Sequence, residues 1–374
     1  MPDGSTARNT IPSVLFAGGG SGGHISPGLA IAEALREADP RTKCIFAPST
    51  REIDRSMLHQ AGAEFIPMPA RPLGRSPRGI LECWRGYRAT IAATRELLIA
   101  HRIDRVVALG GFVSAPVVST ARRVGLPVLL LNLDRVPGRA NRMVARRATT
   151  VLSAVQTIEH GTHWPAVGLP IRRSAQAAST PEASRNALGL DPRRETLLIT
   201  GASQGARTIN ELVPLIARDL ADALASWQVL HLCGDEHLVP SLQSQWNDAG
   251  IPVQVRSFLH EMGQAWGAAS LCISRAGANS VAEAWAGAVP TIFLPYPHHR
   301  DMHQLHNAQP MAATGGAIIV EDRRDADLTR SDLEPLLRHL VGSGEDRTRM
   351  RKALVRESPG DVAAQVARTV IELG

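Results

Sequence analysis

Aromatic residues and cysteines are scarce in this chain of 374 residues. Phe, Trp and Tyr together make up 4% of the sequence, and the four cysteines form no CxxC motif. Widely separated cysteines predict neither a disulfide framework nor a zinc site, but reduced side chains in the core of a cytosolic protein. Long apolar segments are also missing, because Gly110-Gly111 and Pro116 interrupt the longest uncharged run, residues 106–121. The first residues show no basic region followed by an apolar stretch. We therefore expect neither a signal peptide nor a membrane-spanning helix.

What the sequence does contain is typical of a globular protein. Apolar residues account for 44% and charged residues for 20%, and the length predicts two domains. The net charge of +6 and the isoelectric point of about 9.7 favour acidic partners, which include phosphates, nucleic acid and anionic membranes. Nucleic acid is the least favoured of these, because no recognition motif or aromatic stacking surface is found.

Short apolar runs rich in Val, Ile and Leu alternate with segments of helical period along the whole chain. This alternation predicts an α/β fold of parallel sheets covered on both faces, arranged as two doubly wound, Rossmann-like domains. We expect the boundary at residues 168–172, after a strand ending near Val167. The expected strands are residues 14–17, 44–47, 105–109, 128–131, 151–153, 197–200, 228–232, 253–255, 271–274, 291–294 and 317–320.

The first half opens with a strand that runs directly into a glycine-rich turn, Gly18-Gly19-Gly20-Ser21-Gly22-Gly23, followed by His24. Such a turn lets a ligand approach the backbone and leaves the amides of a helix N-terminus available to an anion. No Lys-Ser/Thr pair follows, so it is not a P-loop, and the histidine at the helix entrance argues against a dinucleotide fingerprint. His24 is a candidate general base or a histidine hydrogen-bonded within the turn.

The second half repeats this architecture at two turns. Gly201-Ala202-Ser203-Gln204-Gly205 follows one strand, and Ser274-Arg275-Ala276-Gly277-Ala278 follows another. A helix after the second of these turns carries Glu283, whose carboxylate is suited to accept hydrogen bonds from a ribose diol; a solvated surface glutamate is the alternative. Two anion-binding turns and a diol acceptor together favour a nucleotide ligand.

Two further segments each allow two interpretations. In residues 297–306, the i,i+4 spacing of His299 and His303 permits a metal site, but a polar pocket wall is favoured because no ligand from a second segment is evident. In residues 71–88, arginines alternate with Leu73, Ile80, Leu81 and Trp84. This pattern suits either an anionic membrane surface or a helix with its apolar side in the core.

Taken in order, six motifs resemble the MurG-type N-acetylglucosaminyltransferases of glycosyltransferase family 28. They are AGGGSGGHISPGLAIAEAL, LGGFVSAPV, GLPIR, GASQGARTIN, SRAGANSVAEAWAGAVP and PYPHHRDMHQLHNA. The resemblance implies a GT-B fold with a cleft between an acceptor-binding, membrane-facing domain (1–168) and a UDP-GlcNAc-binding domain (172–356). It also implies that residues 357–374 form a helix that returns to the first domain.

The implied reaction is the inverting transfer of N-acetylglucosamine from UDP-GlcNAc to the muramoyl C4 hydroxyl of lipid I, which gives lipid II for peptidoglycan synthesis. The implied location is the cytoplasmic face of the inner membrane, with peripheral attachment to its anionic surface through residues 71–88. No cofactor or metal is implied, because helix N-termini and an arginine would stabilise the departing diphosphate and no DxD-type metal site is evident.

The resemblance also assigns residues to the two substrates. It places the acceptor diphosphate and reacting sugar at Ser21, Gly22, Gly23 and His24. It places the donor at Arg172, Ser203, Gln204, Gly277, Ala278, Glu283, His303 and Gln304. In this assignment Glu283 binds the ribose diol, His303 and Gln304 bind the sugar hydroxyls, and the others lie near the diphosphate.

Two positions depart from the family's pattern. Phe112 stands where a tyrosine is usual, and Leu131-Asn132-Leu133-Asp134 replaces the usual His-Glu-Gln-Asn. Asp134 therefore joins His24 as a candidate catalytic base. The alternatives are a related transferase with another acceptor, a hexosamine-nucleotide epimerase of the same fold, and a nucleotide-sugar-binding protein without activity.

Overall fold

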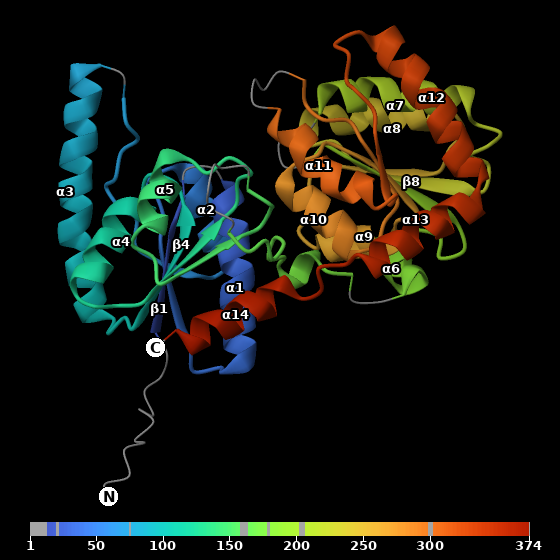
Figure 1. Cartoon of the computed structure of the whole chain (residues 1–374). Coiled ribbons are helices and arrows are strands. Elements are labelled where there is room, and N and C mark those ends of the chain that lie inside the picture. The colour runs from blue at the N-terminus through green and yellow to red at the C-terminus, as the bar shows by residue number, and fades with distance from the viewer. Residues whose placement is uncertain are drawn as a thin grey trace, which may run out of the picture. The chain divides into compact units, whose positions relative to one another are not determined.

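The computed structural model describes residues 13–19, 22–74, 76–157, 164–177, 180–201, 206–297 and 302–373. The chain divides into two compact units (Figure 1). Unit 1 comprises Met1–Arg172 and Asp361–Gly374, and unit 2 comprises Arg173–Gly360. Each unit contains one six-stranded parallel sheet with helices on both faces.

The sheet of unit 1 has the strand order β3-β2-β1-β4-β5-β6. Its strands are β1 (Ser13–Gly18), β2 (Lys43–Ala47), β3 (Glu64–Phe65), β4 (Arg105–Gly110), β5 (Val128–Asn132) and β6 (Thr150–Ser153). Its helices are η1 (Gly22–His24), α1 (Ile25–Ala38), α2 (Glu52–Gln60), α3 (Pro77–Ala100), α4 (Ser114–Arg123), α5 (Arg139–Ala145) and α14 (Val362–Glu372).

Alternate residues of each central strand face the two helical layers of unit 1. In β1, Val14 and Phe16 pack with α1, α2 and α14, while Leu15 and Ala17 pack with α3, α4 and α5. Side chains on a strand point to opposite faces with a period of two, so a strand buried on both sides must be apolar throughout. This requirement explains the uninterrupted apolar runs in the sequence.

Helix α14 belongs to unit 1 although the whole of unit 2 separates it in sequence from the other elements of unit 1. The Asp361 side chain caps it by accepting a hydrogen bond from the N–H of Ala364 at 3.0 Å. Its buried side chains, Val362, Ala363, Val366, Ala367 and Val370, recur with helical period and join the same core cluster as α1. Helix α14 therefore completes the core of unit 1 on the side of α1.

The sheet of unit 2 has the order β12-β11-β10-β7-β8-β9. Its strands are β7 (Glu195–Thr200), β8 (Trp227–Leu232), β9 (Val253–Arg256), β10 (Leu271–Ser274), β11 (Thr291–Phe293) and β12 (Ala317–Ile319). One core cluster lies under α7 (Arg207–Asp219), α8 (Val239–Asp248) and α12 (Ala326–Gly342). The other lies under α6 (Pro181–Leu188), α9 (Met262–Ala268), α10 (Ala278–Ala286), α11 (His303–Ala313) and α13 (Gly344–Arg356).

The two sheets have the same topology, which confirms the repeated architecture expected from the sequence. In each, the first strand pairs with the second on one side and the fourth on the other. Two details differ from expectation. The two-residue strand β3 was not predicted. The prediction of a strand that ends near Val167 is wrong, because that segment forms only an isolated bridge between Ser153 and Ala166.

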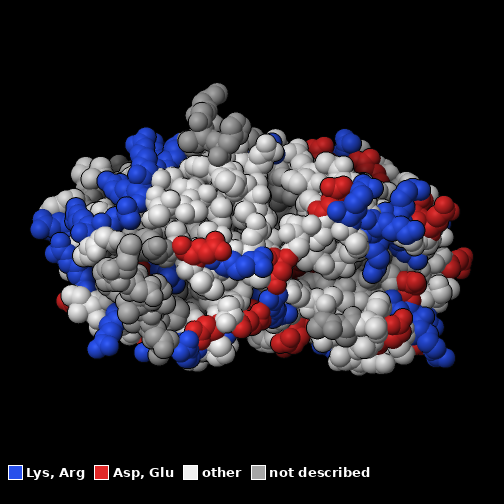
Figure 2. All heavy atoms as spheres, turned by 60° about the horizontal axis from the view of Figure 1, so that its bottom comes forward, with Lys and Arg blue, Asp and Glu red and all other residues white. Residues whose placement is uncertain are grey.

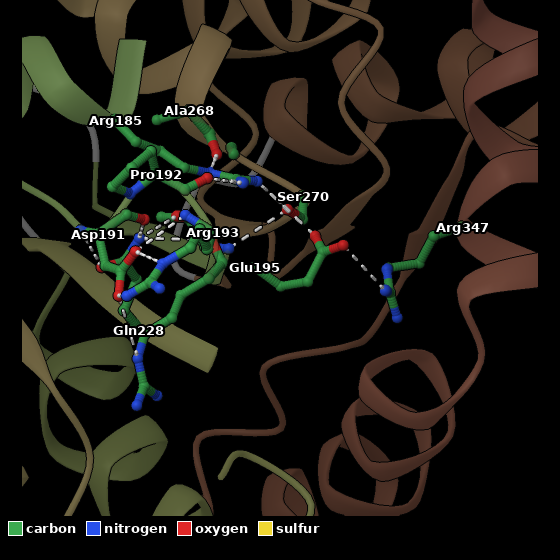
Figure 3. A network of polar contacts seen from close by, with 12 residues as sticks. Arg185, Asp191, Pro192, Arg193, Glu195, Gln228, Ala268, Ser270 and Arg347 are labelled. Carbon is green, nitrogen blue, oxygen red and sulfur yellow. Dashed lines mark hydrogen bonds and ion pairs between the residues drawn. The ribbon is translucent and has the colours of Figure 1, made fainter. Parts of the chain in front are cut away.

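A network of polar contacts closes the amino edge of the unit 2 sheet (Figure 3). The buried guanidinium of Arg185 donates to the carbonyls of Ala268 and Pro192, each at 3.1 Å, and to Ser270 Oγ at 2.9 Å. Glu195, the first residue of β7, lies 3.7 Å from Arg185 and 3.9 Å from Arg347. Hydrogen bonds and ion pairs within the chain therefore stabilise the amino edge of this sheet.

Helix α3 presents its apolar side chains to solvent along its first two turns. Ile80, Leu81 and Trp84 are 52%, 44% and 54% exposed, and Leu73, just before the helix, is 63% exposed. The interpretation that this apolar side lies in the core is therefore wrong. Across the described parts of the chain, no helix combines the length and the hydropathy needed to cross a membrane.

Candidate functional site

Gly22, Gly23 and His24 follow β1, and Gly277 and Ala278 follow β10; both strands border the point where the strand order of their sheet reverses. In unit 1 this point lies between β1 and β4, and in unit 2 between β7 and β10. The loops that leave the carboxyl ends of two such strands run in opposite directions and leave a crevice in which open α/β sheets bind ligands. The glycine-rich turns after β1, β7 and β10 all begin at these carboxyl ends.

The turn after β1 packs tightly against α2 and the loop before it. Gly19 has φ +153°, and a Cβ on it would lie 2.5 Å from Oδ2 of Asp54 and 2.8 Å from the backbone N of Ser49. Asp54 is fully buried, and its Oδ2 accepts a hydrogen bond from Ser49 Oγ at 2.6 Å. Only glycine fits this position. Ser21 lies outside the described residues, whereas Gly22 and Gly23 form η1 with His24.

His24 ends η1 and precedes the first turn of α1. Burial lowers the pKa of His24 below its ordinary value of 6.5, while the negative charges of Asp134 and Asp54 oppose this effect. The imidazole is therefore neutral at pH 7 and able to accept a proton. Asp134 itself is exposed. The negative charges of Asp134, the second predicted candidate, and of Asp54, which no sequence motif indicated, thus both raise the pKa of His24 against the effect of burial.

A chain of buried amides supports the segment that carries Asp134. Asn132, at the end of β5, donates from Nδ2 to the carbonyl of Asp134 at 2.6 Å and to Ser153 Oγ at 2.9 Å. Its Oδ1 accepts from Nδ2 of Asn141 at 2.8 Å. A Cβ on Gly110 would come within 2.7 Å of Asn141 Oδ1. Asn132 was noted in the sequence only as part of a divergent motif, but here it orients the Asp134 backbone.

Arg172, predicted to lie near the donor phosphates, makes its contact within unit 1. Its Nε donates to Oε1 of Glu33 on α1 at 2.9 Å, and both side chains are about one-third exposed. Arg172 is the last residue of the first segment of unit 1, and Glu33 fixes its guanidinium there. The predicted role of Arg172 toward the donor stays a prediction.

The turn after β10 leads into the N-terminus of α10. Gly277 is the N-cap residue and Ala278 the first helical residue. Among the residues that the structure describes, the nearest atom to a Cβ on Gly277 would be Ser280 Oγ, at 3.9 Å, and φ is −63°. Neither packing nor backbone conformation therefore requires glycine here.

Glu283 lies in the second turn of α10 and contacts α9. Its Oε2 accepts a hydrogen bond from Nε1 of Trp266 at 2.9 Å, and Trp266 is 1% exposed. Burial raises the pKa of Glu283 to about 7, and the hydrogen bond from Trp266 opposes part of this rise. The solvated surface glutamate considered above is therefore wrong. Trp266 was missed in the sequence because nothing in its spacing shows that α9 and α10 place these two side chains together.

Helix α11 begins with His303 and Gln304. Oε1 of Gln304 accepts a hydrogen bond from the backbone N–H of Tyr296 at 2.9 Å. Asn307, one turn further, donates from Nδ2 to the carbonyl of Ala276 at 3.1 Å and so ties α11 to the turn before α10. Ser203, Gln204 and His299 lie outside the described residues. Within the described part of the chain, no group of three His, Cys, Asp or Glu side chains is placed to hold a metal ion.

Two family models match the chain, one over each sheet. The model described as the glycosyltransferase family 28 N-terminal domain matches residues 14–153, and the model of the corresponding C-terminal domain matches residues 196–366. Together they cover most of both sheets.

Curated relatives match over nearly their whole length. The UDP-N-acetylglucosamine–N-acetylmuramyl-(pentapeptide) pyrophosphoryl-undecaprenol N-acetylglucosamine transferase of Nocardioides sp. (strain ATCC BAA-499 / JS614) is 39% identical over 367 residues, which are 96% of this chain and 98% of the relative. The enzyme of the same name from Streptomyces coelicolor is 37% identical over 323 residues, 84% of this chain and 85% of the relative.

Solved structures share the fold at lower identity. MurG of Acinetobacter baumannii superimposes with a TM-score of 0.73 at 23% identity, covering 96% of this chain and 99% of that one. UDP-GlcNAc 2-epimerase of Neisseria meningitidis, bound to UDP-GlcNAc, gives a TM-score of 0.62 at 13% identity, covering 96% and 99%. At these identities the likeness concerns the fold, which is the GT-B arrangement of two Rossmann-like domains expected from the sequence.

Proposed function

Because the chain belongs to glycosyltransferase family 28, we propose that it transfers N-acetylglucosamine from UDP-GlcNAc to the muramoyl C4 hydroxyl of lipid I, with inversion, to form lipid II. The observation that carries this proposal is the end-to-end relationship to enzymes named for this reaction, at 39% identity over 98% of one relative. A catalytically silent protein is disfavoured because the candidate base and the donor-binding carboxylate are both retained.

Unit 2 binds the donor in this proposal. The diphosphate lies at the N-terminus of α10, where the backbone amides of Gly277 and Ala278 and the helix dipole favour negative charge. The open surroundings of Gly277 support this assignment, because Ser280 Oγ, at 3.9 Å, is the nearest described atom to a Cβ placed there. A glycine that packing does not require is explained by a ligand that approaches its backbone. Glu283 accepts hydrogen bonds from the ribose diol, and Trp266 holds its carboxylate in place. Ser203 and Gln204 complete the diphosphate site.

Unit 1 binds the acceptor and supplies the base. The acceptor diphosphate lies at the turn that includes Ser21, Gly22 and Gly23. His24 accepts the proton of the C4 hydroxyl as its oxygen attacks the anomeric carbon and the bond to UDP breaks. Asp134, which stabilises the protonated imidazole, is the alternative base. Helix dipoles and Arg172 stabilise the charge that develops on the leaving UDP.

Helix α3 attaches the enzyme to the membrane that contains its acceptor. Lys and Arg side chains gather on the side of unit 1 that α3 and α4 form (Figure 2). The Arg88 guanidinium lies 4.9 Å from the ring centroid of the exposed Trp84. Further along α3, a shallow depression of about 320 Å³ is lined by Arg88, Arg95 and Arg123 together with Ile91 and Ala92. Apolar side chains flanked by arginines favour peripheral binding to an anionic leaflet, here the cytoplasmic face of the inner membrane.

One assay tests the reaction and separates the alternatives. The protein is incubated with UDP-GlcNAc and lipid I, and both UDP release and the mass of the lipid product are measured. Release of UDP that depends on lipid I and a product heavier by one N-acetylglucosamine residue support the proposal. Isomerisation of UDP-GlcNAc without lipid supports an epimerase, turnover only with another acceptor supports a related transferase, and binding without turnover supports a silent protein.

A further inference from the structure

A buried ion pair lies beneath the proposed donor site and takes no part in the roles assigned above. Arg275 follows β10, Asp322 follows β12, and they are 5% and 3% exposed. The Arg275 Nη1 lies 2.9 Å from the Asp322 Oδ2. Removing two charges from water is costly, and apolar residues of similar size often stabilise a core as well or better. The pair therefore calls for an explanation beyond stability.

The guanidinium of Arg275 holds the segment that follows β11. Its Nη1 donates to the carbonyl of Leu294 at 2.9 Å and lies 3.4 Å from the carbonyl of Pro295, while the Arg275 guanidinium is 5.6 Å from the ring centroid of Tyr296. The backbone N–H of Arg275 donates to the carbonyl of Thr200, the last residue of β7, at 3.3 Å. One residue thus joins the carboxyl ends of three neighbouring strands.

Asp322 connects the ion pair to the other end of the same segment, residues 294–297. Its Oδ1 accepts a hydrogen bond from the backbone N–H of Arg324 at 3.1 Å. The Arg324 side chain in turn donates to the carbonyl of Pro297. Two arginines linked through one carboxylate therefore hold the backbone of residues 294–297 at its first and last residues.

The segment so held orients a predicted sugar-binding side chain. The backbone N–H of Tyr296 donates to Oε1 of Gln304, which fixes the amide oxygen and leaves the amide nitrogen of Gln304 to donate elsewhere. We propose that Arg275 and Asp322 are positioning residues that determine how Gln304 meets the donor sugar, so that they control sugar recognition separately from recognition of UDP. This inference rests on the proposed function, in which Gln304 binds the hydroxyls of N-acetylglucosamine.

Arg275→Lys tests the proposal, because lysine keeps the charge opposite Asp322 and lacks the planar fork that holds the carbonyls. The affinities for UDP-GlcNAc and for UDP are measured by calorimetry on the full chain. We expect the affinity for UDP-GlcNAc to fall about tenfold, the equivalent of one well-placed hydrogen bond, and that for UDP to stay within about twofold. Discrimination against UDP-GalNAc, the C4 epimer, should shrink by a similar factor.

Arg185→Lys is the matched control. Arg185 is also buried, also donates to two backbone carbonyls and also lies near a carboxylate, but at the amino edge of the sheet (Figure 3). It should lose comparable stability in thermal melts without changing the ratio of the two affinities. Arg324→Met is a second test that carries little risk to folding, because Arg324 is exposed; it should shift the ratio in the same direction as Arg275→Lys.

Two results would overturn the proposal. One is an equal loss of affinity for UDP and UDP-GlcNAc in the Arg275 variant, which indicates general damage to unit 2. The other is an unchanged ratio in a folded Arg324→Met protein. Failure of the proposed function looks different, because the unmodified protein would then release no UDP in response to lipid I, whatever its affinities for UDP and UDP-GlcNAc.

Discussion

Replacing Glu283 with glutamine is expected to make unit 2 more stable and donor binding weaker at the same pH. Burial raises the pKa of this carboxyl from its ordinary value of 4.5 to about 7. Between these pH values the folded protein keeps a proton that the unfolded chain has released, so stability falls as the pH rises from 4.5 to about 7. A tenfold change in acid dissociation corresponds to about 1.4 kcal/mol, so ionised Glu283 costs the fold about 3 kcal/mol above pH 7.

Glutamine removes this cost because it is neutral at every pH and its amide oxygen still accepts the hydrogen bond from Trp266. Chemical denaturation followed by tryptophan fluorescence measures the difference between the two proteins. At pH 8 we expect Glu283→Gln to increase the free energy of unfolding by up to about 3 kcal/mol, and near pH 4.5 we expect no difference. An equal or lower stability of the variant at pH 8 would refute the reasoning, since it would mean that the ionised carboxylate carries no burial cost.

Donor binding should change in the opposite direction. The ionised carboxylate is the better acceptor for a ribose diol, so the affinity of the unmodified protein for UDP-GlcNAc should fall about tenfold between pH 8 and pH 6. Glu283→Gln should bind more weakly by about 1.5–3 kcal/mol and lose most of this pH dependence. Helix α11 also packs on α10 and carries His303 and His306, and α13 carries Arg351. A pH dependence that persists in the variant would assign the titration to those histidines.

Four further perturbations give separate tests. His24→Ala should lower kcat by about 10²–10⁴-fold with donor affinity unchanged, and retained turnover in this variant would make His24 a structural residue. Asp134→Asn should move the acid limb of the pH–rate profile to lower pH, because the charge of Asp134 raises the pKa of His24. Gly277→Ala should keep stability within about 1 kcal/mol but weaken UDP-GlcNAc binding about tenfold, since the added methyl enters space kept for the diphosphate. Changing Arg78 and Arg85 together to Glu should reduce co-sedimentation with phosphatidylglycerol vesicles at low salt, because each arginine contributes about 1 kcal/mol to the free energy of membrane binding. Undiminished sedimentation would place the membrane contact elsewhere.

Apolar runs predicted most strands of the two sheets, because a strand that is buried on both faces requires apolar side chains at successive positions. The same logic could not detect β3, since the pair Glu64–Phe65 has no apolar run, and its pairing with β2 arises only when the neighbouring strand is in place. The strand predicted to end near Val167 is not formed, because that segment makes only an isolated bridge, between Ala166 and Ser153.

The candidate site was foreseen as separate motifs but not as contacts. The turns that contain Gly19 and Gly277 are visible in the sequence because glycine and the preceding strand are local signals. The hydrogen bond between Trp266 and Glu283 and the field of Asp54 at His24 depend on how helices pack, and no spacing along the chain encodes them. Arg172 shows the same limit, since its contact with Glu33 joins residues 139 positions apart.

The return of α14 to unit 1 has a consequence for the order in which the ribosome makes the protein. Residues 13–172 emerge first, but the apolar face of α1 lacks its partner until all of unit 2 and then residues 361–373 have been translated. At about 5–20 residues per second, unit 2 alone takes roughly 10–40 s to synthesise. During this time the part of α1 that later packs against α14 stays exposed, and it is an apolar surface to which a chaperone can bind. Unit 2, the later of the two to be translated, is therefore expected to complete its core first.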